Sequence, residues 1–292
     1  MRLALMTAAA AVACSASPAW AQRSTQPGAL LQPAEQPGLP RSYLQLGLGV
    51  AVNSDYDGSD DYRLLPGAVL RARYRGIDIA TEGLGVSADF ISTGKRVDFD
   101  LGPVVALNLN RTGGIDDEIV DLLPQRDAAV EVGVLAGVSI GQITNPFDSL
   151  SLRVKVTHDI AGAHGGTIVS PSVTFGTPLS LRTFVGLSAS AEFVTNDYAD
   201  YYFSVTPAEA LATGGPLPGP RIRSFDADGG LKDWSLGLIL GQSLTGDLRK
   251  GWSLFGLANY SRLVGDFRRS PLVADRGSAN QWFGAVGLGY TW

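Results

Sequence analysis

Alternation of apolar and polar residues along most of the chain restricts its fold more than any other feature. Between Arg96 and Asn110, alternate positions are largely apolar, and the positions between them are mostly polar, charged or glycine. The same pattern recurs in 128–142, 149–160 and 231–245. A period of two predicts β-strands with two different faces, and no stretch of eighteen uninterrupted apolar residues suggests a membrane helix. We therefore expect an all-β protein.

Two all-β architectures produce such alternation. A soluble sandwich places the apolar face inside, whereas a membrane barrel places it outside. The expected strands often span roughly ten to fourteen residues, while soluble strands average about five or six. Aromatic residues gather near the strand ends, as an interfacial girdle requires: Tyr43, Tyr74, Phe90, Phe175, Phe193, Trp252, Trp282 and Tyr290. These features favour a closed antiparallel transmembrane β-barrel.

The C-terminal segment carries the most specific local signal. The chain ends on Trp292, and Tyr290, Leu288, Val286 and, beyond Gly284, Trp282 precede it at every second position. Bacterial outer-membrane barrels characteristically end in this way, and the assembly machinery of that membrane reads the final strand. We therefore predict that these five residues, Trp282, Val286, Leu288, Tyr290 and Trp292, form the assembly signal of a barrel in the cell outer membrane.

Twelve strands are predicted from the pattern. They are 42–53, 65–75, 76–82, 84–92, 96–110, 128–142, 149–160, 166–177, 181–195, 231–245, 251–264 and 280–292. Single-chain bacterial barrels have even strand numbers, short periplasmic turns and long extracellular loops. If the first strand starts from the periplasm, the long connections 54–64, 111–127, 196–230 and 265–279 all lie outside. Fusing 76–92 into one strand would give eleven, and removing it from the barrel would give ten, which stays the alternative.

The connection 196–230 is unusually long and carries no clear barrel strand. Its first part, 196–205, is rich in aromatic residues and is compatible with a strand standing above the membrane. The four prolines that follow argue against a barrel strand. The segment is predicted to be a cap, a lid or a binding loop.

The N-terminal segment has the features of a secretory signal. Arg2 precedes a short apolar run, and Ala19-Trp20-Ala21 forms a cleavage site. We expect a signal peptide over 1–21, a disordered Pro/Gln-rich periplasmic leader over 22–41 and the barrel over 42–292. A weak lipoprotein box ending at Cys14 is the alternative. The formal net charge of -5 gives no sign of the basic face that nucleic-acid binding usually requires.

Charged residues occupy the face that would line the lumen. They are Arg71, Arg73, Arg96, Asp98, Asp100, Glu131, Arg153, Lys155, Arg182, Glu192 and Asp233. Unpaired charges in a narrow lumen are costly, so we expect ion-paired, partly hydrated networks. A barrel of about twelve strands is intermediate between filled and open barrels, which favours a narrow or blocked lumen.

Enzymatic chemistry finds little support in the sequence. The two histidines, His158 and His164, lie in a glycine-rich segment without the His-x-Ser-Asn type of motif that barrel lipid hydrolases carry. Asp60-Asp61 and Asp116-Asp117-Glu118 could serve an omptin-like protease or bind cations that bridge lipopolysaccharide, but solvated loop charge is the simpler interpretation. No spacing matches an EF-hand or a histidine metal site. We predict a non-enzyme without a cofactor.

Several short motifs occur in a characteristic order. Asn53 to Tyr62, with Tyr56, Gly58, Ser59 and Asp60, is followed by Pro66. Later come Tyr202-Phe203-x-Val205-x-Pro207, Gly229-Gly230, Leu263-Val264-Gly265-Asp266 with Ser270-Pro271, and Gly287-Leu288-Gly289-Tyr290. Across 42–292 the chain resembles the MipA/OmpV family of outer-membrane proteins.

The resemblance implies a role rather than a reaction. The namesake of the family is a scaffold that links a lytic transglycosylase to a murein-synthesising penicillin-binding protein, and other members are described as adhesins or stress-responsive proteins. No catalytic motif defines the family, so no catalytic residue is carried over. Two hypotheses follow: a scaffold or adhesin-like interaction protein, and a narrow channel for small solutes. The expected partners are outer-membrane lipid and lipopolysaccharide, the assembly machinery and periplasmic murein enzymes.

Overall fold

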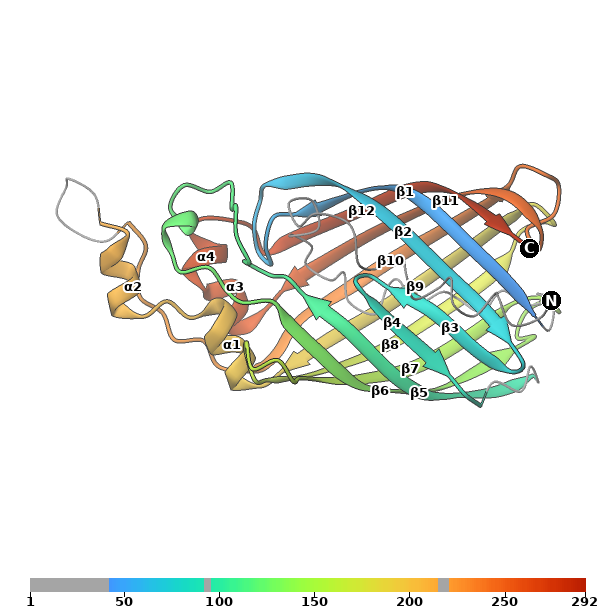
Figure 1. Cartoon of the computed structure of the whole chain (residues 1–292), viewed down its shortest axis with the longest axis horizontal. Coiled ribbons are helices and arrows are strands. Elements are labelled where there is room, and N and C mark those ends of the chain that lie inside the picture. The colour runs from blue at the N-terminus through green and yellow to red at the C-terminus, as the bar shows by residue number, and fades with distance from the viewer. Residues whose placement is uncertain (1–41, 92–95, 215–220) are drawn as a thin grey trace, which may run out of the picture.

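Twelve antiparallel strands close into a barrel in the computed structural model, which describes residues 42–91, 96–214 and 221–292 (Figure 1). The strands are β1 (Tyr43–Ser54), β2 (Tyr62–Tyr74), β3 (Ile77–Glu82), β4 (Gly85–Asp89), β5 (Val97–Asn108), β6 (Ala129–Gly141), β7 (Ser149–Asp159), β8 (Thr167–Pro178), β9 (Thr183–Val194), β10 (Gly230–Ser243), β11 (Gly251–Leu263) and β12 (Asn280–Thr291). Each strand pairs with the next in sequence, and β12 pairs with β1. The prediction of twelve strands is confirmed.

The segment 77–89, for which the sequence left alternatives open, forms a short hairpin within the wall. β3 has six residues and β4 has five, while the other strands have eleven to fourteen. Arg75 and Gly76 both have positive φ, 56° and 85°, as the tightest antiparallel turns require. The alternatives of ten and eleven strands are therefore wrong.

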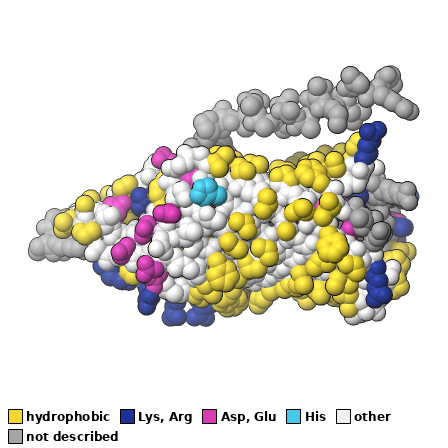
Figure 2. All heavy atoms as spheres, turned by 90° about the horizontal axis from the view of Figure 1, so that it is seen from below, with side chains coloured by type: hydrophobic (Ala, Val, Ile, Leu, Met, Phe, Trp, Pro, Cys, Tyr) yellow, Lys and Arg dark blue, Asp and Glu magenta, His cyan; other side chains and the backbone are white. Residues whose placement is uncertain are grey.

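The wall of the barrel is apolar outside and polar inside. On β5, Phe99 and Leu101 are 58% and 49% exposed, whereas Asp98 and Asp100 are 2% and 4% exposed. The burial pattern of β5 alternates in this way along its whole length. Figure 2 shows the result on one side of the barrel as a broad apolar surface. The lipid-facing side therefore carries the residues that a water-soluble sandwich would bury.

The described parts of the four long connections lie at one end of the barrel, together with the short connections 83–84 and 160–166. The other short turns lie at the opposite end, where β1 begins and β12 ends (Figure 1). The long connections carry the short helices η2 (Val120–Leu122), α1 (Asn196–Phe203), α2 (Pro207–Ala212), α3 (Gly265–Arg269) and α4 (Pro271–Ala274). We call residues 55–61, 109–128, 196–214, 221–229 and 264–279 the cap. Within the described residues, no helix has the length and apolar character needed to cross a bilayer.

The expectation of a strand over 196–205 was wrong, because most of this segment is helix α1. Tyr198, Ala199, Tyr202 and Phe203 are its buried residues. These residues lie at positions i, i+1, i+4 and i+5, so they share one face of the helix, and this face packs against the rest of the cap. That spacing was readable in the sequence, but the aromatic composition favoured a strand. The predicted signal peptide and leader, 1–41, lie outside the described residues.

Candidate functional site: the capped lumen

The cap has its own hydrophobic interior. One cluster joins α1 and α3 to the outer end of the barrel. It contains Ile168, Val194, Tyr198, Ala199, Tyr202, Phe203, Ala227, Leu263, Phe267 and Val273. A second contains Tyr56, Ile119, Val120, Leu123, Val205, Ala210, Ile222 and Leu272. The rings of Phe203 and Phe267 meet edge to face with centroids 5.0 Å apart. The outer end of the barrel is therefore covered by a packed structure.

The family-motif loop serves as a packing element of the cap. Tyr56 is fully buried, and its hydroxyl donates to the carbonyl oxygen of Leu272 at 3.0 Å. Gly58 has φ of +100°, and a Cβ there would lie 2.4 Å from Cγ2 of Val273. Ser59 is also fully buried, and its carbonyl accepts from Gln281 Nε2 at 2.9 Å. These residues join the first loop to the last.

The two other motif residues lie elsewhere. Asp60 is exposed at the outer end, and Pro66 lies within β2, opposite Val50 of β1, and is exposed. The motif residues Tyr56, Gly58 and Ser59 therefore have a structural explanation that Asp60 and Pro66 do not share.

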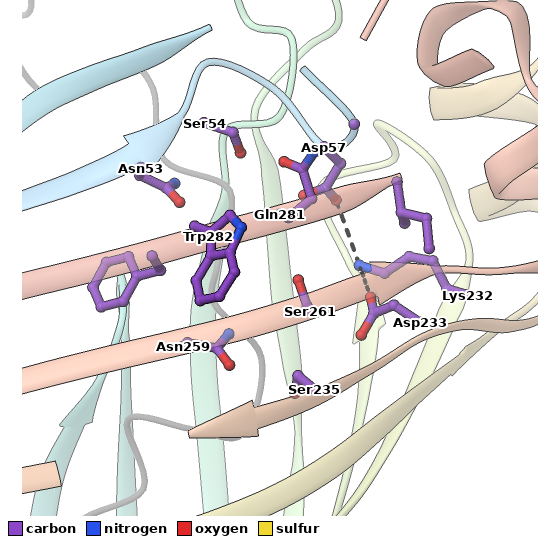
Figure 3. A pocket seen from close by; sticks show the side chains of 13 residues that line it. Asn53, Ser54, Asp57, Lys232, Asp233, Ser235, Asn259, Ser261, Gln281 and Trp282 are labelled. Atoms are coloured by element: carbon purple, nitrogen blue, oxygen red, sulfur yellow. Dashed lines mark hydrogen bonds and ion pairs between the residues drawn. The ribbon is translucent and has the colours of Figure 1, made fainter. Parts of the chain in front are cut away.

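A buried ammonium group joins the cap to the barrel wall (Figure 3). Lys232 Nζ lies 2.5 Å from Glu192 Oε2, 3.3 Å from Asp233 Oδ2 and 3.4 Å from Asp57 Oδ2. It also lies 5.6 Å from the centroid of the Tyr198 ring. Asp57 comes from the first cap loop, and Tyr198 comes from α1. The cluster of Asp57, Glu192, Lys232 and Asp233, here called the lysine cluster, therefore ties two cap segments to the wall.

Burial raises the pKa of Asp57, although the Lys232 ammonium opposes this shift. The ammonium group of Lys232 therefore stabilises the charged form of the Asp57 carboxylate. An ion pair of this kind is costly to break from one side, because the remaining charge stays buried.

Lys232 was absent from the predicted lumen residues. Strict alternation from Asp233 would direct the neighbouring Lys232 toward lipid. A register shift lies between Leu231 and Asp233 where β10 pairs with β9, and at this bulge both charged residues turn inward. The sequence signal was a lysine next to an aspartate at a strand end, a place where bulges are common.

Arg111 is a second buried cation under the cap. It has φ of 58°, is 2% exposed, and donates from Nη1 to the carbonyl oxygen of Tyr202 at 3.2 Å. Burial and the neighbouring Arg126 lower the pKa of Arg111 to about 10. Arg126 in turn pairs with Glu209 at 3.2 Å and lies 5.1 Å from the centroid of the Tyr201 ring. These contacts connect the 109–128 loop to α1 and α2.

Nearer the periplasmic end of the barrel, oppositely charged side chains that line the lumen form ion pairs. Arg73 lies 2.6 Å from Asp78, Arg153 lies 2.8 Å from Asp100, and Lys155 lies 3.8 Å from Glu82. Glu131 accepts from Asn108 at 3.0 Å and from Thr157 at 3.3 Å.

The other predicted lumen residues have varied positions. Asp98 is buried, and Arg71 lines a cavity beside Asp100 and Arg153. Arg96 and Arg182 are exposed and lie instead on periplasmic turns. The reason is that β5 and β9 begin at Val97 and Thr183, later than predicted.

The described lumen contains several small cavities. One lies beside the lysine cluster and is lined mainly by polar residues from β1, β10, β11 and β12; its volume is 40 Å³ (Figure 3). A second, under Tyr198, measures 10 Å³, and a third, beside Arg153, measures 40 Å³. Since a water molecule needs at least about 10–15 Å³, the two larger cavities have room for about three waters each and the smallest for at most one. They fit a narrow, hydrated lumen.

The two histidines do not form a common site. His158 faces outward on β7, where its Nδ1 lies 3.0 Å from Oγ1 of Thr167. His164 is buried against the rings of Tyr198 and Tyr202, with Nε2 at 3.6 Å from Glu131 Oε1. Its Nδ1 accepts from the backbone N–H of Gly166 at 3.0 Å, which places the ring proton on Nε2. Packing explains His164, whereas His158 is an exposed side chain in contact with Thr167.

The predicted assembly-signal residues share the outward face of β12. Trp282, Val286, Leu288 and Trp292 are 49–59% exposed. Tyr290 packs between Trp252 and Trp292, with centroids 5.1 Å and 4.6 Å away. Tyr43, in contrast, is only 5% exposed and belongs to the inward face of β1, so it is not part of an outer girdle.

Comparison with known proteins gives consistent matches. A family model described as "MltA-interacting protein MipA" matches residues 46–292. Outer membrane protein Omp26La of Vibrio anguillarum is 25% identical over 229 residues, which cover 76% of this chain and 77% of that protein. Outer membrane protein OmpV of Vibrio cholerae is 25% identical over 230 residues, 77% of each chain.

Solved structures of outer-membrane proteins also align with the chain. The Vibrio cholerae protein OmpT aligns with 8% identity and a TM-score of 0.35, covering 86% of this chain and 97% of that one. The outer-membrane channel DcaP of Acinetobacter baumannii aligns with 10% identity and a TM-score of 0.37, covering 84% and 72%.

Proposed function

Because the chain belongs to the MltA-interacting protein (MipA) family and its relatives are outer-membrane proteins, we propose that it is a structural, partner-binding barrel of the outer membrane. In this role the barrel is an anchor. The cap presents a folded surface to the outside, and the short turns present a surface to the periplasm.

The observation that carries this proposal is the packed cap over the outer end of the barrel. Phe203, Phe267 and Tyr202 are each 1% exposed, and the lysine cluster binds the cap to the wall from below. A wide, permanently open channel does not require such a packed covering. A stable surface for a partner benefits from one, because a rigid surface loses little conformational entropy on binding.

The periplasmic turns offer a second surface for a partner. A cavity of 430 Å³ lies between three turns and is lined by the apolar residues Phe147, Leu179, Leu181, Phe184 and Leu248. Leu179 and Leu181 are 67% and 75% exposed. The scaffold role of the family's namesake, a link between murein-degrading and murein-synthesising enzymes, would require contacts on this side.

A narrow channel for small solutes is the second candidate. The polar cavities along the lumen, one of them beside the Arg153–Asp100 ion pair, favour it, since a solute path needs polar space inside the barrel. In that case the cap would have to move to admit a solute.

Two measurements test the proposal on the full-length mature protein. Planar bilayers containing the purified barrel are expected to show no steady current. Cross-linking in cells, from a photoreactive residue at position 179 or 181, is expected to capture periplasmic murein enzymes, with position 211 on the cap as control. Steady, size-selective currents together with no periplasmic cross-link would overturn the structural role in favour of the channel.

A further inference from the structure

Three aromatic rings form a continuous row on the lipid-facing side of β10–β12, near their outer ends. Trp234 and Tyr260 meet edge to face with centroids 5.6 Å apart, and Tyr260 lies 4.9 Å from Trp282. Trp282 is 59% exposed. Tryptophan and tyrosine rings concentrate where the hydrocarbon core meets the headgroups. The row therefore marks the level of the outer leaflet's headgroups on this side.

An arginine lies directly within this interface. Arg262 on β11 is the register partner of Trp234 on β10 and of Asn280 on β12. Its side chain points to the same outward face of β11 as that of Tyr260, because the two residues are two positions apart on the strand. Among the described residues, no carboxylate forms an ion pair with Arg262.

Helix α3 brings more positive charge to the same rim. It begins two residues after β11 ends, and the backbone N–H of Val264 donates to the carbonyl of Lys232 at 2.9 Å, which holds this connection against β10. Arg268 and Arg269 on α3 are both exposed. Arg223 reaches the same helix, donating to the carbonyl oxygen of Arg269 at 2.6 Å.

Two of the carboxylates near α3 are already engaged. Asp266 pairs with Arg269, and Asp275 pairs with Arg223 at 3.0 Å. Across the described part of the chain, Arg268 has no such carboxylate partner. Arg262 and Arg268 therefore remain available for an external anion.

We propose that Arg262 and Arg268 bind the phosphate groups of the lipopolysaccharide anchor, lipid A, at the outer rim of β10–β12. A guanidinium presents two parallel N–H donors that match two phosphate oxygens, and this pairing is strongest where water is partly excluded. The aromatic row would contact the acyl chains and the sugar at the same level. Basic residues at this height are the usual means of recognising an anionic lipid headgroup.

The charge at the outer end is unevenly distributed. Figure 2 shows acidic side chains over the face of the cap that it presents, while basic side chains gather along one edge.

The test uses the mature protein in detergent and a titration with lipid A, followed by tryptophan fluorescence and by native mass spectrometry. The double variant Arg262→Gln/Arg268→Gln is expected to bind lipid A on the order of twentyfold more weakly, at roughly fivefold for each arginine removed. The matched control is Arg75→Gln/Arg182→Gln. It removes two exposed arginines from periplasmic turns and is expected to bind like the parent protein.

A second measurement keeps the proposal testable if the variant folds poorly. The unaltered protein is expected to bind lipid A more tightly than lipid A from which both phosphates have been removed, and inorganic phosphate alone is expected to compete weakly. Equal binding of the two lipids, or equal loss in both double variants, would overturn the proposal. Neither result bears on the partner-binding role proposed above.

Discussion

The barrel wall and the cap of this chain bury opposite kinds of side chain. On β5 the aspartates are buried, while Phe99 and Leu101 are exposed. In the cap, Phe203 and Phe267 are buried, whereas Asp197 and Asp200 on α1 are exposed. The chain therefore buries polar side chains in the wall and apolar side chains in the cap, and the boundary between the two patterns lies at the outer ends of the strands.

The difference shows that solvent, rather than the residue itself, decides what a protein buries. In lipid, apolar side chains lose nothing by exposure, and backbone groups must be paired, which the closed barrel achieves. In water, the cap gains from withdrawing apolar surface, by about 25 cal/mol for each Å². The lysine cluster lies between these regions, and its charges are paired with one another because the cavity of 40 Å³ beside it holds too little water to hydrate each of them separately.

The largest effect is expected where the two regions meet. Lys232→Met removes the cation and leaves Asp57, Glu192 and Asp233 buried together, so the free energy of unfolding should fall by about 5 kcal/mol. Lys155→Met is the control, because the ion pair of Lys155 with Glu82 is long, at 3.8 Å, and its loss should cost less. Urea unfolding in liposomes measures both. Equal losses would show that the cluster has no special role.

A cavity in the cap should loosen the cap and leave the wall intact. Phe203→Ala is expected to lower the stability of the cap by about 4 kcal/mol, because a fully buried ring is lost. Limited proteolysis should then cut the cap, while the heat-modifiable gel shift of the folded barrel persists. The exposed Leu122 provides the control as Leu122→Ala. If barrel and cap unfolded together, the two regions would not be separable.

Two exposed leucines test the difference in solvent directly. Leu101 on β5 is 49% exposed, and Leu211 on α2 is 69% exposed. Leu101→Arg should cost about 3 kcal/mol because its charge enters lipid. Leu211→Arg should change stability by less than about 0.5 kcal/mol because it meets water. Similar costs in a denaturant titration would refute the assignment of the two environments.

Acid should weaken the cap before the wall, and this effect should be smaller than those of the three substitutions above. Burial alone would raise the pKa of Asp117, but hydrogen bonds from Arg276 and from the N–H groups of Val120 and Ile119 outweigh it and lower the pKa. The carboxylate therefore stabilises the cap at neutral pH, and this contribution is lost as the pH falls below about 4, toward the lowered value.

The measurement is protease protection of the cap between pH 7 and pH 3. Arg276→Gln should reduce the loss of protection in the acid range. Arg223→Gln, which removes a solvent-exposed ion pair with Asp275, should change the profile little. A pH profile unaffected by Arg276→Gln would show that Asp117 does not contribute in this way.

The wall was predictable from the sequence, and the cap was not. Alternation persists through each of the ten long strands, the placement of all long loops on one side favoured two further strands in 76–92, and the aromatic C-terminus indicated the membrane. The helices of the cap have three to eight residues and depend on contacts between distant loops, such as Tyr56 with Leu272. Short helices of this kind leave little periodicity to recognise.

The lysine cluster was predicted only in part, for a local reason. Glu192 and Asp233 follow the alternation and were expected in the lumen, whereas Lys232 departs from it at a bulge. Asp57 lies within the recognised motif, but only the folded loop brings it to Lys232. A departure of one residue from strict alternation was enough to hide the cation that joins the two regions.

Accessibility along β5 tests the inverted wall most directly. In a Cys14→Ser background, single cysteines at positions 98 to 101 would be labelled in liposomes, once with a water-soluble maleimide and once with a probe quenched from the lipid phase. We predict alternation, with positions 99 and 101 quenched from lipid, and positions 98 and 100 shielded from it. Labels at all four positions that respond alike would contradict a barrel with its apolar side facing outward.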